Sequence, residues 1–342
     1  MRPAPVTLAI ALAAGAVAAQ SPQPLTAPPH LHKLAHTYSI VAIDPSNGDL
    51  GVAVQSKFPN VGGIVPWAEA GVGAVATQAL ANTDYGERGL RLLAEGRSAE
   101  EALRAVMATD TSLQERQVGI VDARGNAASF TGGNTFEWAG GRVGRPDGQA
   151  GGIAGGRGDV IAGRTYAAQG NILVSAATVR AMAETFERAT GDLADRLTAA
   201  LKAGQAAGGD KRGMQSAALL VVRKKGGYLG LNDRLVDIRV YDAPDPIAEL
   251  ERLLALHKLH FFPSEERDLI PITPEIVKQL EPILLNEPAG QPEKWLKAPQ
   301  GEANQTFLEA LRNFMYWENY DVRVRMDGKI DRVVLEDILR KR

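Results

Sequence analysis

Residues 37–58 read "TYSIVAIDPSNGDLGVAVQSKF", and this stretch decides the fold. Two apolar segments, 37–44 and 49–56, predict strands. The Asn47–Gly48 pair between them favours a tight hairpin turn. Thr37 opens the hairpin, and Ser39 shares its face because alternate side chains of a strand point the same way. Thr37 is either an ordinary first residue of a strand or a new amino terminus that carries chemistry.

The segment before Thr37 is typical of a leader. Arg2 precedes a short apolar run that ends in the small residues "AVAAQ", a pattern that predicts a signal peptide over residues 1–19. Residues 20–36 are rich in proline and lack periodicity, so they indicate a linker. The apolar run is too short to span a bilayer. We therefore expect a secreted or periplasmic protein with no membrane segment in its mature form.

Composition excludes several chemistries. The 342 residues carry a net charge of −2 and no block of Lys or Arg, so no nucleic-acid partner is indicated. The chain has no cysteine, and none of its five histidines lies between residues 37 and 256. A Ser-His-Asp triad and a His- or Cys-ligated zinc site cannot be built there. No cofactor or metal is expected.

The order of elements favours two antiparallel sheets. A third strand is predicted from Val72, then two helices, a hairpin that turns at 123–126, a strand ending in "AAQGNIL", two more helices, further strands within 216–242 and a helix opened by Pro246. The Gly-rich stretch 139–163 shows no periodicity and is predicted to be a surface loop. An α+β sandwich of two sheets between two helical layers fits this order. From residue 263 the composition changes, and residues 263–342 predict a small all-α module.

A hydrolase without His or Cys can use an N-terminal Thr or Ser. The free α-amino group of that residue has a pKa of roughly 8, so it can accept the hydroxyl proton near neutral pH. Such an enzyme needs a hydroxyl residue at a processed terminus on the first strand of a sheet. Thr37 meets this positional requirement, and Ser39 is the fallback. A cut between His36 and Thr37 is then required.

Five separated blocks resemble one family: "TYSIVAIDPSNGDLGVAVQSKF", "VPWAEAGVGAVATQALANTDYGERGLRLLAEGRSAEEAL", "RQVGIVDARGNAASFTGG", "AAQGNIL" and "GDKRGMQSAALLVV". It is the bacterial family catalogued as domain of unknown function 1028, which is grouped with the N-terminal nucleophile hydrolases. The resemblance covers about residues 37–258 and implies a four-layer αββα sandwich over a domain at 37–260. It implies no particular substrate. The tail resembles a module described as peptidoglycan-binding, although a packing or dimerisation module is an alternative.

The resemblance also gives Lys57 a role. A Lys near the end of the second strand of N-terminal nucleophile hydrolases lowers the pKa of the nucleophile by Coulombic attraction. Many relatives carry His at this position, and a solvated loop lysine is the alternative interpretation. Gly140 to Gly163 is an apparent insertion relative to the family pattern.

Polar residues at strand ends are the candidate substrate-binding groups. Gln78 and Asn82 follow the third strand, where side-chain amides would stabilise an oxyanion, unless Asn82 only caps the next helix. Gln169 and Asn171 would hold a substrate amide or carboxylate, unless they only form a turn. Four more residues open an apolar strand and form either an anion clamp or a charged turn: Asp210, Arg212, Gln215 and Ser216.

Aromatic residues have two interpretations as well. Trp67 and Trp138 either line a pocket or belong to the core, and Tyr316 and Trp317 either stack on glycan or pack in the tail.

These observations predict an exported amidohydrolase that cleaves an amide-type bond of a small-molecule or peptide-like substrate, held near peptidoglycan by its tail. A non-catalytic exported binding protein on the same scaffold is the alternative. A structural oligomer formed through its sheets is a third interpretation, and a homo-oligomer fits any of the three.

Overall fold

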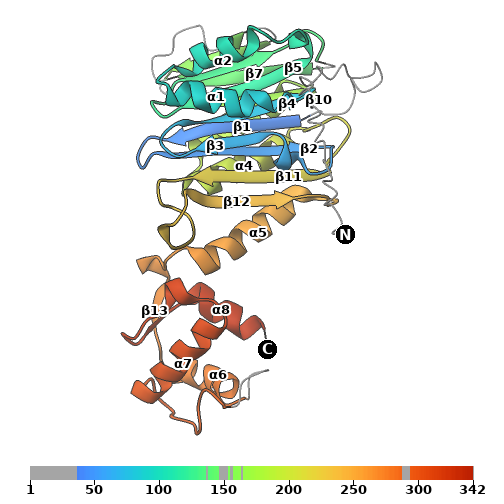
Figure 1. The fold of residues 1–342 in the computed structure, drawn as a ribbon. Helices are drawn as coiled ribbons and strands as arrows, with labels where there is room; N and C mark the ends of the chain where they lie inside the picture. The colour runs from blue at the N-terminus through green and yellow to red at the C-terminus, as the bar shows by residue number, and fades with distance from the viewer. Residues whose placement is uncertain are drawn as a thin grey trace, which may run out of the picture. The chain divides into compact units, whose positions relative to one another are not determined.

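The computed structural model describes residues 37–135, 138–145, 153–154, 157–162, 165–286 and 293–341 (Figure 1). The predicted signal peptide and linker, residues 1–36, lie outside the described residues. For the strands within 153–162, only the main-chain pairing is described.

The first sheet has seven strands in the order β12-β11-β2-β1-β10-β7-β9. Its members are β1 (Thr37–Asp44), β2 (Asp49–Ser56), β7 (Trp138–Arg145), β9 (Arg157–Ala162), β10 (Tyr166–Leu173), β11 (Ser216–Val222) and β12 (Arg234–Val240). The strand that begins at Thr37 is therefore the central one. It runs antiparallel to β2, with Thr37 opposite Ser56, and to β10, with Ser39 opposite Gln169.

The predicted β1–β2 hairpin is confirmed. Gly48 has a φ of 79°, which glycine tolerates without strain, and its N–H donates to the Asp44 carbonyl oxygen at 2.8 Å. The Asn47 side chain accepts from the Asp49 N–H at 2.9 Å. Local turn chemistry therefore sets the register of the two central strands.

The second sheet has five strands in the order β3-β4-β5-β6-β8. They are β3 (Pro66–Glu69), β4 (Gly73–Ala79), β5 (Arg116–Asp122), β6 (Ala127–Thr131) and β8 (Ile153–Ala154). The short edge strand β3 was not predicted. The hairpin turn at 123–126 was predicted, and it lies between β5 and β6, where Gly125 has a φ of 86°.

Three apolar cores stack these elements into four layers (Figure 1). Three helices cover the first sheet: α3 (Ala177–Arg188), α4 (Leu193–Ala206) and α5 (Pro246–Phe261). Two helices cover the second sheet: α1 (Asp84–Ala94) and α2 (Ala99–Met107), the latter opened by a Ser98–Glu101 capping box. Between the sheets, Val41 and Ile43 meet Ala74 and Val121. The αββα sandwich is therefore confirmed.

The prediction of a surface loop over residues 139–163 is wrong where the structure describes this stretch. Strand β7 pairs with β10, and β9 runs parallel to β7. Glycines hid the strand, because they carry no side chain from which a two-residue period can be read. Gly141 fits a tight place, since a Cβ there would lie 3.0 Å from the Ser129 hydroxyl and 3.1 Å from the Ala168 carbonyl oxygen.

The C-terminal module has its own core. Its helices are α6 (Pro274–Leu284), α7 (Gln305–Trp317) and α8 (Arg332–Arg340), and its buried residues include Val277, Phe307, Leu311 and Val334. The module is helical as expected, with one addition, a short ladder between β13 (Leu269–Pro271) and β14 (Lys329–Asp331). Among the described residues, no helix is long and apolar enough to cross a membrane.

Candidate active site

The apolar core between the sheets gives way to polar side chains at one end of β1. Residues 37, 39, 41 and 43 share the face that looks toward the second sheet, because side chains alternate along a strand. Val41 and Ile43 belong to the core between the sheets, whereas positions 39 and 37 are Ser and Thr, 0% and 1% exposed. Buried polar groups need partners, so the hydrogen bonds of this end define the site.

Ser39 is held by two amides from different sheets. Its hydroxyl donates to Gln78 Oε1 of β4 at 2.6 Å and accepts from Gln169 Nε2 of β10 at 2.7 Å. All three side chains are fully buried. Gln169 lies inside a strand rather than in a turn, so the turn interpretation of this residue is wrong.

Gln117 of β5 is the centre of the network, and sequence reasoning missed it. Its Oε1 accepts from Gln78 Nε2 and from Asn171 Nδ2, both at 2.8 Å. Its Nε2 donates to Thr131 Oγ1 at 2.9 Å and to the Gly170 carbonyl oxygen at 2.8 Å. The available signal was a Gln directly before the apolar run 118–121, whereas Gln78 was selected for its place at the end of the third strand.

Thr37 is fixed through its main chain as well as its side chain. Its carbonyl oxygen accepts from Gln78 Nε2 at 3.2 Å and from Asn171 Nδ2 at 3.4 Å, and its hydroxyl donates to Ser56 Oγ at 3.1 Å. Thus three of the predicted polar residues, Gln78, Gln169 and Asn171, converge on the start of β1. In this arrangement Gln78 and Asn171 position residue 37, because the N–H groups of both amides donate to Gln117 and to the Thr37 carbonyl.

Lys57 directly follows β2 and was predicted to lower the pKa of the nucleophile by Coulombic attraction. Its side chain is exposed, and Nζ donates to the Met214 carbonyl oxygen at 3.1 Å. No hydrogen bond or ion pair between described residues joins Lys57 to Thr37. Its main-chain N–H donates to Asp210 Oδ2 at 3.3 Å, which ties the end of β2 to the segment before β11.

Asp210 and Arg212 form an ion pair at the same end of the first sheet. Arg212 Nε lies 3.1 Å from Asp210 Oδ1, and Nη2 lies 2.7 Å from Oδ2. Asp210 is 2% exposed, whereas the Arg212 side chain is 30% exposed. This bidentate geometry occupies two of the donors with which Arg212 was predicted to clamp a substrate carboxylate.

Ser216 and Gln215 contribute to the end of the sheet in different ways. Ser216 lies opposite Ser56, which lies opposite Thr37, so three hydroxyl residues form one row across β11, β2 and β1. The Ser216 hydroxyl accepts from the Val61 N–H at 3.1 Å. Gln215 acts through its main chain, donating to the Ser56 carbonyl oxygen at 3.0 Å.

Asn82 lies in another cluster, which joins the start of α1 to β5. Asn82 Nδ2, the Tyr85 hydroxyl and Arg116 Nε donate to Asp110 Oδ2 at 3.2, 2.7 and 2.9 Å. Burial alone would raise the pKa of Asp110, but the hydrogen bonds from Arg116 and Tyr85 outweigh it and hold that pKa well below its usual range. Burial raises the pKa of Tyr85. Asn82 also accepts from the Asp84 N–H at 3.2 Å, as a residue at a helix start does.

The aromatic residues divide between core and surface. Trp67 is partly buried against the core between the second sheet and its helices, and its Nε1 donates to the Ile64 carbonyl oxygen at 2.9 Å. Trp138 is partly buried against the core of the first sheet. In the module, Tyr316 and Trp317 are 50% and 46% exposed, and the rings of Trp295 and Trp317 lie 6.1 Å apart.

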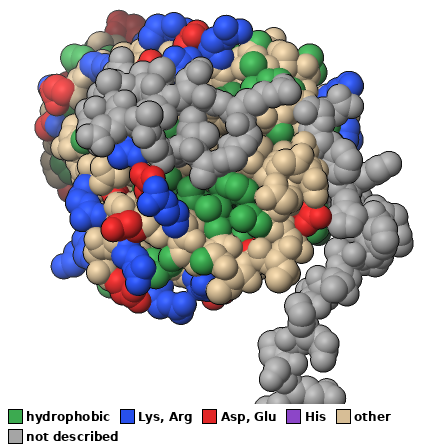
Figure 2. All heavy atoms as spheres, turned by 90° about the horizontal axis from the view of Figure 1, so that it is seen from above, with side chains coloured by type: hydrophobic (Ala, Val, Ile, Leu, Met, Phe, Trp, Pro, Cys, Tyr) green, Lys and Arg blue, Asp and Glu red, His purple; other side chains and the backbone are tan. Residues whose placement is uncertain are grey.

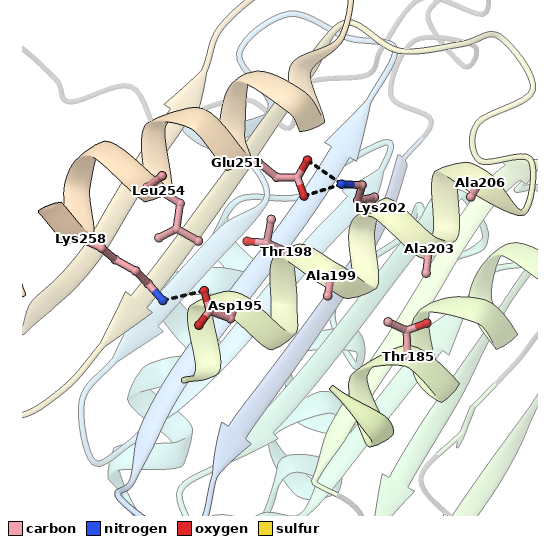
Figure 3. Close-up of a pocket in the computed structure, with 11 residues that line it drawn as sticks. Thr185, Asp195, Thr198, Ala199, Lys202, Ala203, Ala206, Glu251, Leu254 and Lys258 are labelled. Carbon is pink, nitrogen blue, oxygen red and sulfur yellow. Dashed lines mark hydrogen bonds and ion pairs between the residues drawn. The ribbon is translucent and has the colours of Figure 1, made fainter. Parts of the chain in front are cut away.

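A pocket and an apolar patch are also found on the surface. A pocket of about 680 Å³ on the outer face of the helices has a floor of alanines from α4 and a rim that includes the Lys202–Glu251 ion pair (Figure 3). It faces away from the space between the sheets, where Thr37 lies. Hydrophobic side chains also gather on the face shown in Figure 2, beside residues that are not described. Within the described ranges, no three His, Cys, Asp or Glu side chains are grouped to hold a metal.

Comparison with known proteins agrees with this architecture. Residues 37–154 and 144–250 match the model described as "Family of unknown function (DUF1028)". The chain belongs to this family. A solved DUF1028 structure, protein SPO2555 from Silicibacter pomeroyi, is 31% identical with a TM-score of 0.55, over 65% of this chain and 86% of that one. Residues 296–338 match a model described as "Putative peptidoglycan binding domain". None of the curated proteins matches.

This membership and the module together indicate association with the cell wall. The DUF1028 match begins at Thr37, the first residue of the central strand.

Proposed function

We propose that the protein is an exported, cell-wall-associated amidohydrolase whose nucleophile is Thr37, freed by cleavage of the His36–Thr37 peptide bond. The observation that carries the proposal is the set of buried amides that converges on residue 37. Gln78 and Asn171 hold its carbonyl oxygen, and Gln117 holds both of them. A residue fixed in this way keeps its α-amine and hydroxyl in one geometry, which favours catalysis by orientation.

The chemistry uses groups of one residue. The neutral α-amine of a freed Thr37 takes the hydroxyl proton while Oγ1 attacks the substrate carbonyl carbon. The resulting ammonium returns the proton to the leaving nitrogen, and an ester forms on Oγ1. Water, deprotonated by the same amine, then hydrolyses the ester. No histidine lies between residues 37 and 256 to compete for this role.

The other polar residues serve the substrate in this proposal. Arg212 is partly exposed beside the row of hydroxyls at the ends of β1, β2 and β11, where it would attract an anionic group. The module would hold the enzyme in place and take no part in the reaction. Exposed aromatic rings suit stacking on sugar faces, so Tyr316 and Trp317 would bind the protein to peptidoglycan. The substrate class is an amide of a peptide-like or small acyl compound near the wall.

The test begins with the terminus of protein recovered from the exporting cell. Sequencing of that terminus should return Thr37, and the Thr37→Ala variant should hydrolyse none of a panel of N-acyl and peptide amides. Thr37→Ser should keep activity, because Ser also offers a hydroxyl and an amine. Ser39→Ala tests the fallback hydroxyl separately, because Ser39 bonds to Gln78 and Gln169 of the same network but is not the proposed nucleophile. Hydrolysis that survives Thr37→Ala would refute the assignment.

A non-catalytic binding protein is the second candidate. It is favoured by the burial of Thr37 in the intact chain, where the side chain is 1% exposed and its hydroxyl is bonded to Ser56. Intact mass separates the two candidates. A mature terminus near residue 20 on fully functional protein supports binding, and a terminus at Thr37 supports the hydrolase.

A further inference from the structure

The last strand of the first sheet, β12, has one edge that no described strand occupies. It is the end member of the strand order, paired on one side with β11. Its residues Asp237, Ile238 and Arg239 also line a pocket of about 1010 Å³, together with residues of α5 and of the C-terminal module. Among the described hydrogen bonds outside that ladder, none uses the main chain of residues 236–240. An open strand edge is a template for another strand unless something blocks it.

The sequence of this edge is complementary to itself. Residues 236–240 read Val-Asp-Ile-Arg-Val, with the apolar residues buried under α5 and the two charges on the other face. When two copies pair antiparallel around Ile238, Asp237 of each lies opposite Arg239 of the other, and Val236 lies opposite Val240. Opposite charges and apolar pairs placed directly across two strands are both stabilising.

Other registers lack this match. A pairing centred on Asp237 places two aspartates opposite each other, and one centred on Arg239 places two arginines opposite each other. Like charges in directly opposed positions destabilise a sheet. A register shifted by one residue places the apolar face of one strand on the same side of the sheet as the charged face of the other.

Exposed apolar side chains at the two ends of β12 support the same arrangement. The loop before the strand exposes Tyr228, Leu229 and Leu231 by 65%, 76% and 81%. Just after the strand, Tyr241 is 63% exposed. Antiparallel pairing brings the loop end of one strand to the Tyr241 end of the other, so these groups would cover each other. Such clusters are unusual on a monomer and mark interaction sites.

We propose that the protein forms a symmetric dimer in which β12 pairs antiparallel with β12 of a second copy, around a two-fold axis at Ile238. The two seven-stranded sheets then form one continuous sheet. The proposal is independent of any catalytic activity. In a single chain Asp237 binds Arg239 Nε at 2.9 Å, and in the dimer each carboxylate gains the arginine of the other copy.

The test is an exchange of charges between two variants of the full chain. Sedimentation velocity of the wild type should show a dimer. Asp237→Arg and Arg239→Asp each place like charges across the axis, so each alone should weaken dimerisation at least tenfold. Mixed in equal amounts, they should form a heterodimer with wild-type affinity, because the arginine introduced in one variant then faces the aspartate introduced in the other. Circular dichroism should show both variants folded, since both sites lie at the surface.

Each outcome decides the proposal. Restoration by mixing requires contact between copies, and charge pairs within one chain cannot produce it. A monomeric wild type at micromolar concentration, single variants that dimerise normally, or a mixture that stays monomeric would each overturn the proposal. Should either variant unfold, Tyr241→Asp provides the second test, because it charges the exposed end of the strand. It should also give monomers, and an unchanged dimer would count against the register.

Discussion

The buried amide network allows a comparison of two identical substitutions. Gln117 and Gln55 both lie in strands of the main domain and are both 0% exposed. Gln117 makes four hydrogen bonds of 2.8–2.9 Å, whereas neither amide atom of Gln55 has a partner in the described part of the chain. Replacing each by Leu removes the same polar group without leaving a large cavity.

The expected effects differ in size and sign. Gln117→Leu leaves four buried partner groups without their bond: an N–H of Gln78, an N–H of Asn171, the Gly170 carbonyl oxygen and the Thr131 hydroxyl. An unsatisfied buried polar group costs about 1–3 kcal/mol. If half of the four regain a partner, we expect a loss of about 4 kcal/mol, a large part of the roughly 5–15 kcal/mol that stabilises a typical domain. Gln55→Leu removes two unpaired atoms, so it should be neutral or stabilise by up to about 1 kcal/mol.

Urea-induced unfolding followed by circular dichroism measures both variants. The midpoints should separate clearly while the dependence on urea stays constant, which shows that only stability changed. The reasoning fails if the two variants lose stability equally, within about 1 kcal/mol. Loss of cleavage before residue 37 in Gln117→Leu alone would further link the network to the proposed nucleophile.

Three further predictions concern packing and ionisation. Gly86→Ala should destabilise the protein by roughly 1–3 kcal/mol, because the new Cβ would lie 2.2 Å from the indole ring of Trp67. Gly89→Ala on the same helix is the control. Its Cβ would lie 3.2 Å from the nearest atom, so its stability should stay within about 1 kcal/mol of wild type in the same urea unfolding assay. Asp110→Asn should lower the free energy of unfolding by about 3 kcal/mol at neutral pH. In acid unfolding this difference between variant and wild type should shrink below roughly pH 4, because a carboxyl group with a lowered pKa stabilises the fold only while it is ionised. Burial raises the pKa of Tyr320 to about 12, so the stability of the module should fall between roughly pH 10 and that value. The absorbance of phenolate follows the ionisation of Tyr320, and Tyr320→Phe should remove the dependence of stability on pH in this range.

Local rules were sufficient for most elements of the fold. The Asn-Gly turn, the Ser98–Glu101 capping box and the apolar periodicity of the helices follow from neighbouring residues, and the structure confirms each. Several strands escaped these rules, and two of them show the physical reason. Strand β3 has four residues and starts with a proline, and β7 owes its place to glycines that fit against the second sheet.

The candidate site was predicted as parts rather than as a whole. Gln78, Gln169 and Asn171 were selected separately, and only the pairing of strands brings them to Thr37. Their hub, Gln117, comes from a strand whose inward face is not marked in the sequence. Asn82 is also a side-chain amide and lies only four residues after Gln78, yet it donates to Asp110 in another cluster. A single sequence does not show which distant residue a buried amide will bind.

The central position of β1 bears on what a cut before Thr37 would do. Ends of polypeptides usually fray, since their last residues lack neighbours on both sides. Here β2 pairs with the strand from Thr37 to Asp44, and β10 pairs with it from Tyr38 to Ala42, so a newly made terminus would be held by the sheet from its first residue. Severing one bond would then create an ordered reactive end without any rearrangement of the strands around it.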